Sequence, residues 1–66
     1  MAISYKKLWK LLIDKDLKKK DLREMAGISA SSITKLGNNE NVNIEMLERI
    51  CKALDCEISD IIEMHP

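Results

Sequence analysis

Apolar residues recur every three or four positions along most of this chain, which is the spacing of helices that bury one face. The first stretch carries the i, i+3, i+4, i+7 pattern at Tyr5, Leu8, Trp9 and Leu12, and it predicts a helix over about residues 4–15. The same spacing predicts four further helices, over about residues 19–26, 30–37, 44–54 and 59–64. No segment alternates between apolar and polar residues in the manner of a strand. The pattern therefore predicts an all-α fold, a compact five-helix unit in which residues 1–66 form a single domain.

The same periodicity predicts the core and the ends of the helices. Gly27 supplies the positive φ that ends the second helix, and Asp55 takes the comparable position after the fourth. Ser29, Asn43 and Ser59 are suited to cap the N-termini of the last three helices. From the second helix onward, the expected inward positions are Leu22, Met25, Ala26, Ile33, Leu36, Ile44, Leu47, Ile50, Cys51, Leu54, Ile58, Ile61 and Ile62.

The second and third predicted helices are joined by so few residues that they must cross steeply. Ala26 allows a close approach, Gly27 makes the turn, and Ile28 and Ile33 hold the later helix across the earlier one. This arrangement leaves the outer face of the third helix protruding, so that it can enter a major groove. Residues 19–37 therefore read as a helix-turn-helix, although any helical hairpin could show part of this pattern.

Charge is unevenly distributed although the formal net charge is zero. Residues 1–39 hold nine basic and four acidic groups, whereas residues 40–66 hold two basic and seven acidic groups. The two parts therefore carry +5 and −5. A positive face of this kind can bind phosphate while an acidic face points away, but an uneven solvated surface is the alternative.

Length and composition argue against an enzyme, because 66 residues leave little room for a deep catalytic pocket and its support. Cys51 and Cys56 lack C-x-x-C spacing and His65 lies at the chain end, so we expect no metal site, no cofactor and two thiols acting as small buried hydrophobes. No apolar run approaches a membrane span, and the first ten residues include three lysines. We therefore expect a cytoplasmic protein with no small-molecule ligand and no membrane partner.

Two groups of residues together resemble the Cro/C1-type (XRE) helix-turn-helix family. The first is Leu22, Ala26-Gly27-Ile28-Ser29, Ile33 and Leu36, and the second is Leu47-x-x-Ile50-Cys51-x-Ala53-Leu54-x-Cys56. The similarity covers about residues 5–64 and is greatest to the short one-domain regulators of Gram-positive bacteria and their mobile elements. It implies a lambda-repressor-like domain of five helices, acting as a transcriptional regulator and preferentially as a repressor. It also implies a third helix that reads double-stranded DNA, usually as a homodimer on a palindromic operator.

Carried over by position, the resemblance assigns the DNA contacts. The base-facing residues would be Ala30, Ser31, Thr34 and Lys35, with Ser29 and Ser32 nearer the backbone. The remaining expected contacts are Lys18, Lys19, Lys20, Asn38, Asn41 and Asn43. The chain departs from the family at Lys18-Lys19, where Thr-Gln is common, and three lysines there oppose the helix dipole unless phosphates lie beside them. A merely solvated lysine run and an exposed serine-rich helix face are the alternatives.

A second departure concerns an Arg–Glu pair that joins the first helix to the end of the third in many relatives. Leu12 and Gly37 stand at those positions, so both partners are missing together and no buried charge is left without a partner.

The expected dimer surface consists of Ile61, Ile62 and Met64, and Trp9 with Ile13 is the alternative. Trp9 could instead cap the core of so small a domain. A protein-interaction module that keeps the fold but binds another regulator is the competing function, and the zero net charge and surplus apolar residues favour it.

Overall fold

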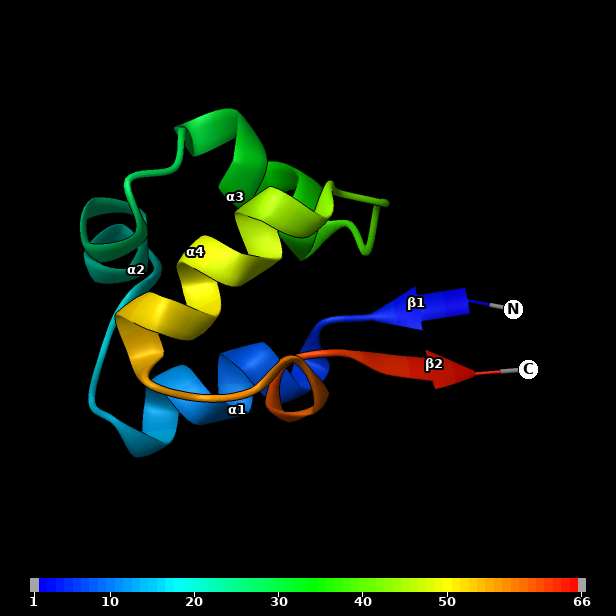
Figure 1. Ribbon diagram of the computed structural model, residues 1–66, viewed down its shortest axis with the longest axis horizontal. Coiled ribbons are helices and arrows are strands. Elements are labelled where there is room, and N and C mark those ends of the chain that lie inside the picture. Colours follow the sequence, from blue (N-terminus) through cyan, green and yellow to red (C-terminus); the bar gives the residue numbers. More distant parts are fainter. Residues whose placement is uncertain (1, 66) are drawn as a thin grey trace.

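The computed structural model describes residues 2–65, which form four α-helices, one short 3-10 helix and a two-stranded sheet (Figure 1). The elements in chain order are β1 (Ala2–Ser4), α1 (Lys6–Asp14), α2 (Lys19–Ala26), α3 (Ala30–Gly37), α4 (Ile44–Leu54), η1 (Ile58–Asp60) and β2 (Glu63–His65). The predicted bounds of the second, third and fourth helices are confirmed. The first helix begins two residues later than predicted and ends one residue earlier.

Local capping explains where α3 and α4 begin and where α2 and α4 end. The Ser29 hydroxyl accepts a hydrogen bond from the Ser32 amide at 3.2 Å, and the side-chain oxygen Oδ1 of Asn43 accepts from the Met46 amide at 2.8 Å. Each bond satisfies one of the free amides at a helix start. Gly27 ends α2 in the left-handed region at φ 66°, as predicted, and Asp55 ends α4 at φ 52°.

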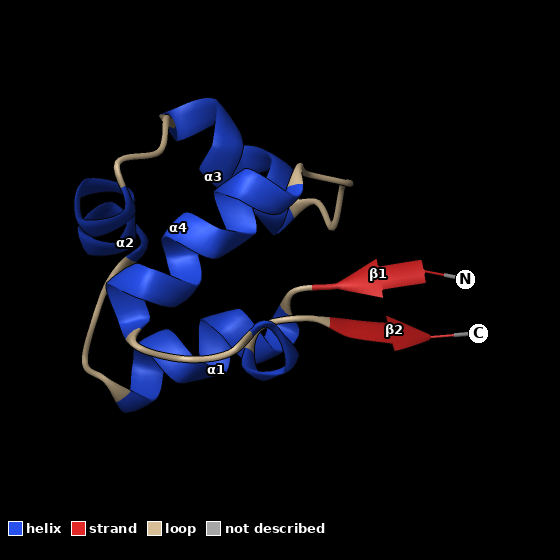
Figure 2. Ribbon diagram, in the orientation of Figure 1, coloured by secondary structure: helices blue, strands red, loops and turns tan. Residues whose placement is uncertain are grey.

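The predicted fifth helix is wrong, and so are the five-helix count and the prediction of no strands. Ile58–Asp60 form a single 3-10 turn, and Glu63–His65 pair antiparallel with Ala2–Ser4 (Figure 2). The register is Ala2 with His65, Ile3 with Met64 and Ser4 with Glu63. Ser59 lies inside the turn and does not cap it. Strands of three residues are too short to show alternation, and each depends on a partner about sixty positions away.

The core lies where α1, α2, α3 and α4 meet, with α4 central in the view of Figure 1. It consists of Tyr5, Leu8, Leu12, Leu22, Ala26, Leu36, Leu47, Ile50, Leu54 and Ile61. Met25, Ile44 and Ile58, all predicted to point inward, are instead 50%, 61% and 40% exposed. Helical spacing indicates the side of a helix on which a residue lies, but not how far the neighbouring elements extend along that side.

Tyr5 connects the N-terminal segment to the loop between α3 and α4. Its side chain is fully buried, and its hydroxyl donates to the Glu40 carbonyl oxygen at 2.7 Å. Its amide donates to Asn39 Oδ1 at 3.1 Å, and Asn39 adopts a left-handed φ of 55°. Burial raises the pKa of the Tyr5 phenol, in keeping with a packing role.

The two cysteines lie on either side of the C-terminus of α4. Both thiols are free and half-buried, and they pack against the core. The Cys56 amide donates to the Cys51 carbonyl oxygen at 3.0 Å, which with left-handed Asp55 forms a helix-ending motif that favours apolar contact between these two positions. Burial raises the pKa of Cys51 and raises that of Cys56 to about 11. Among residues 2–65, no helix is long and apolar enough to cross a bilayer.

Candidate nucleic-acid interface

The hairpin of α2 and α3 has the geometry predicted for residues 19–37. Gly27 makes the turn, and the Ile28 amide donates back to the Arg23 carbonyl oxygen at 3.1 Å. Ile28 and Ile33 are half-buried and pack against the core, while α2 also packs against α4. The hairpin is thus held on its inner side, and the outer side of α3 remains in solvent.

The outer face of α3 carries the four residues expected to face bases. Ala30, Ser31, Thr34 and Lys35 are all exposed, and their spacing places them on one side of the helix. The Thr34 hydroxyl donates to the Ala30 carbonyl oxygen at 3.2 Å. This bond uses the hydroxyl proton and leaves acceptor capacity on the oxygen, so Thr34 can still accept from a base or donate after rotating.

A hydroxyl cluster lies at the N-terminus of α3. The Ser29 oxygen is 2.9 Å from the Ser31 hydroxyl and 3.0 Å from the Ser32 hydroxyl, besides capping the helix. Ser29 is exposed and Ser32 is half-buried. The cluster holds three short polar side chains in defined positions, close to the exposed amides of the helix start, where anions are favoured.

A cationic cleft runs between α2 and α3. It has a volume of about 330 Å³ and is lined by Lys19, Lys20, Arg23, Ala30 and Ile33. Three of these five side chains are basic and the other two are apolar, so the cleft suits a phosphate held by the basic groups. The sequence prediction missed Arg23, although it follows Lys19 and Lys20 by four and three positions and therefore shares their side of α2.

The neighbouring lysine, Lys18, is the N-cap of α2 and is exposed. The backbone amide of Lys18, and not its ammonium group, donates to Asp21 Oδ2 at 2.9 Å. Lys19 behaves differently, because its ammonium nitrogen lies 4.6 Å from the centre of the Trp9 ring. The predicted lysine run is therefore divided between two environments.

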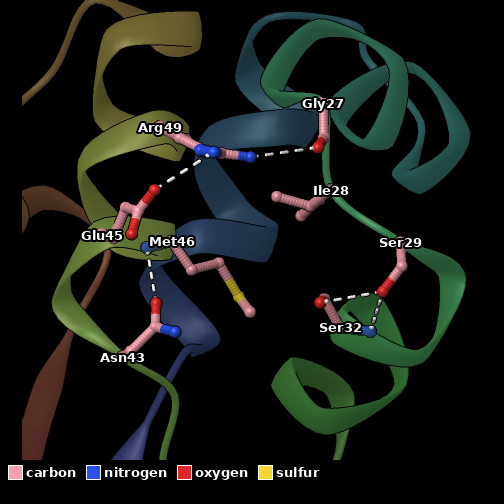
Figure 3. Close-up of a pocket in the computed structure, with 8 residues that line it drawn as sticks. All are labelled: Gly27, Ile28, Ser29, Ser32, Asn43, Glu45, Met46 and Arg49. Atoms are coloured by element: carbon pink, nitrogen blue, oxygen red, sulfur yellow. Dashed lines mark hydrogen bonds and ion pairs between the residues drawn. The ribbon is translucent and has the colours of Figure 1, made fainter.

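A second hollow, of about 280 Å³, lies between the turn of the hairpin and the start of α4 (Figure 3). It brings together Ser29, Ser32 and Asn43, three of the expected DNA contacts. Arg49 crosses it, donating to Glu45 at 3.1 Å and to the Gly27 carbonyl oxygen at 3.5 Å. The arginine charge is partly neutralised there, so this hollow offers hydrogen bonds with little net charge.

The loop asparagines occupy separate positions. Asn38 follows α3 and contacts Glu40 at 3.5 Å, Asn41 is exposed in the loop, and Asn43 caps α4. The cap occupies Asn43 Oδ1 and leaves the side-chain NH2 group of Asn43 available. Within residues 2–65, no three His, Cys, Asp or Glu side chains gather as metal ligands.

The residues expected at a dimer surface do not form one exposed patch. Ile61 is fully buried in the core and is unavailable for contact, and Ile62 and Trp9 are half-buried. Ile13 and Met64 are 75% and 56% exposed, the first near the end of α1 and the second on β2.

Residues 7–66 match the family model described as the Cro/C1-type HTH DNA-binding domain. The chain is also similar to a solved structure described as the transcriptional regulator VanUg, with 55% sequence identity and a TM-score of 0.94. That alignment covers 98% of this chain and 87% of the other. Among curated proteins, none matches the chain significantly.

Proposed function

Because this chain belongs to the Cro/C1-type helix-turn-helix DNA-binding family, we propose that it regulates transcription by binding duplex DNA in a sequence-specific manner with α3 in the major groove. The observation that carries the proposal is the exposed face of α3, at Ala30, Ser31, Thr34 and Lys35, beside a cleft lined by basic side chains. The groups proposed to read bases and those proposed to bind phosphates thus lie next to one another on the same hairpin.

The chemistry of the side chains separates proposed base contacts from proposed phosphate contacts. Lys35 can donate to guanine O6 and N7, Ser31 and Thr34 can exchange hydrogen bonds with base edges, and the Ala30 methyl can contact a thymine methyl. Lys19 and Arg23 have the charge and the position to contact phosphates, which orients the domain without selecting sequence. Lys18, Lys20, Ser29, Ser32, Asn38, Asn41 and Asn43 complete the proposed contact set.

We propose that the protein acts as a homodimer on a palindromic operator. An α3 of eight residues reaches only a few base pairs, and two copies would read successive major grooves about 34 Å apart. Met64 and Ile62 supply the apolar surface for such a contact, and Ile13 on α1 is the alternative. A small domain without an activating surface can repress by occupying an operator that overlaps a promoter, and we therefore propose repression.

A second function has one observation in its favour. Ile13, Met25, Ile44, Ile58 and Met64 are large apolar side chains that are exposed on a domain of zero net charge. A module that binds another regulator would use such side chains and would need no basic cleft.

Selection of duplexes from a random pool, followed by salt titration of the selected site, tests the proposal. We expect a palindromic site and a log–log salt slope of about −0.9 for each phosphate contacted. Lys35→Ala and Ser31→Ala should change the preferred sequence, because each lost base contact removes about 1–3 kcal/mol of discrimination between bases. Lys19→Ala should weaken binding to all duplexes alike.

Lys52→Ala, an equal charge change on the exposed side of α4, serves as the matched control and should leave affinity unchanged. Absence of duplex binding at about 50 mM salt would reject DNA regulation in favour of the protein-binding module. One protein per duplex on a non-palindromic site would reject the dimer.

A further inference from the structure

The single tryptophan of the chain contacts the first residue of α2. Trp9 is half-buried on α1 and packs against the core, and the Lys19 ammonium nitrogen lies over its ring, 4.6 Å from the ring centre. This distance is within the range of about 6 Å over which an aromatic face attracts a cation. The contact joins α1, which has no part in the proposed DNA surface, to the cationic cleft between α2 and α3.

Lys19 occupies an unfavourable place for a cation. It is the first residue of α2, where the helix dipole repels positive charge. The ion pairs among residues 2–65 are Arg49 with Glu45 and His65 with Glu63, so no carboxylate in this part of the chain holds Lys19. The Trp9 ring is the group that offsets the repulsion.

An aromatic ring and a carboxylate restrain a lysine with different consequences. A carboxylate would neutralise the ammonium group, and a phosphate would then have to displace it. A ring attracts the cation through its quadrupole and carries no net charge, so the ammonium keeps its full charge and its free N–H donors. Restraint of a flexible side chain before binding also removes part of the entropy that binding would otherwise cost.

We propose that Trp9 is a positioning residue for DNA binding, whose indole face holds Lys19 at the mouth of the cationic cleft, ready to contact a phosphate. The role rests on the proposed function, because it requires a duplex to be bound there. It gives Trp9 a purpose different from the dimer contact or core cap suggested by its sequence position. The ring face under Lys19 is covered and is not free for a partner protein.

A double-mutant cycle tests the role. Trp9→Leu keeps an apolar side chain but removes the ring, and it should weaken duplex binding by about two- to fivefold, because the cost of ordering the Lys19 side chain then falls on the binding step. In a Lys19→Ala background the same change should have no further effect. In a Lys20→Ala background it should still weaken binding two- to fivefold, because Lys20 is not on the ring. Trp9→Phe retains a weaker aromatic face, so its duplex affinity should lie between those of the unaltered protein and Trp9→Leu. Circular dichroism melting of each variant shows that it is folded.

A measurement without DNA separates this role from the function on which it rests. In the free protein, ring currents should shift the Lys19 ε-protons upfield of those of Lys18 and Lys20, and Trp9→Leu should abolish the shift. If the unaltered protein binds duplexes but Trp9→Leu weakens binding equally with and without Lys19, the positioning role is overturned and the proposed function stands. If the unaltered protein binds no duplex, the proposed function fails and the positioning role fails with it, whatever the ring-current shift.

Discussion

The buried hydroxyl of Tyr5 makes a sharp prediction about stability. Tyr5→Phe removes one oxygen from a fully buried side chain without changing the shape of the ring. The lost interaction is the 2.7 Å hydrogen bond to the Glu40 carbonyl oxygen, which connects the start of α1 to the loop before α4. A single intramolecular hydrogen bond contributes about 0.5–1.5 kcal/mol, and we expect a loss of about 1 kcal/mol in the free energy of unfolding. In a domain of this size, that loss lowers Tm by about 4–8 °C.

Thermal and urea unfolding followed by circular dichroism measure this effect. The dependence of the unfolding free energy on urea should be unchanged, because the variant buries the same apolar surface. Tyr5→Leu, which also removes ring volume, is the matched comparison and should cost clearly more. If Tyr5→Phe were as stable as the unaltered protein, water would be replacing the contact without loss and the reasoning would be refuted. A loss above about 3 kcal/mol would equally refute it, since one hydrogen bond cannot account for it.

Two further predictions concern the end of α4. Asp55→Gly should stabilise the domain by about 1 kcal/mol, because it relieves a non-glycine residue at φ 52° and removes a negative charge from a helix C-terminus. Asp55→Asn should give only the charge-related part in parallel melting experiments, and a lower Tm for Asp55→Gly would contradict the argument. Stability should also fall between about pH 9 and 11, because the Cys56 thiol, with its pKa raised from 9.0 to about 11, stays protonated in the folded chain while the unfolded chain ionises. Cys56→Ala should flatten this fall in urea titrations, and an unchanged pH profile for that variant would show that burial of the thiol is not its cause.

Much of the proposed site could be read from the sequence because its determinants are local. Gly27 ends α2 and Ser29 begins α3 through contacts within three or four residues, and these contacts survive in any packing of the chain. The exposed face of α3 follows from helical spacing once Leu36 is known to point inward. The division of charge between the two parts of the chain is likewise a property of the sequence alone.

Tertiary structure decided the features that join distant segments. The antiparallel pairing of β1 and β2 depends on the termini meeting at one side of the domain, and no periodicity over three residues can reveal it. The burial of Ile61 and the exposure of Ile44 depend on which elements lie beside them, although the sequence pattern predicted both to point inward. The contact between Trp9 and Lys19 arises because α1 and the start of α2 are folded against one another. Caps and turns act through neighbours along the chain, whereas strand pairing, burial and the aromatic contact act through space, and the fold alone determines which residues meet there.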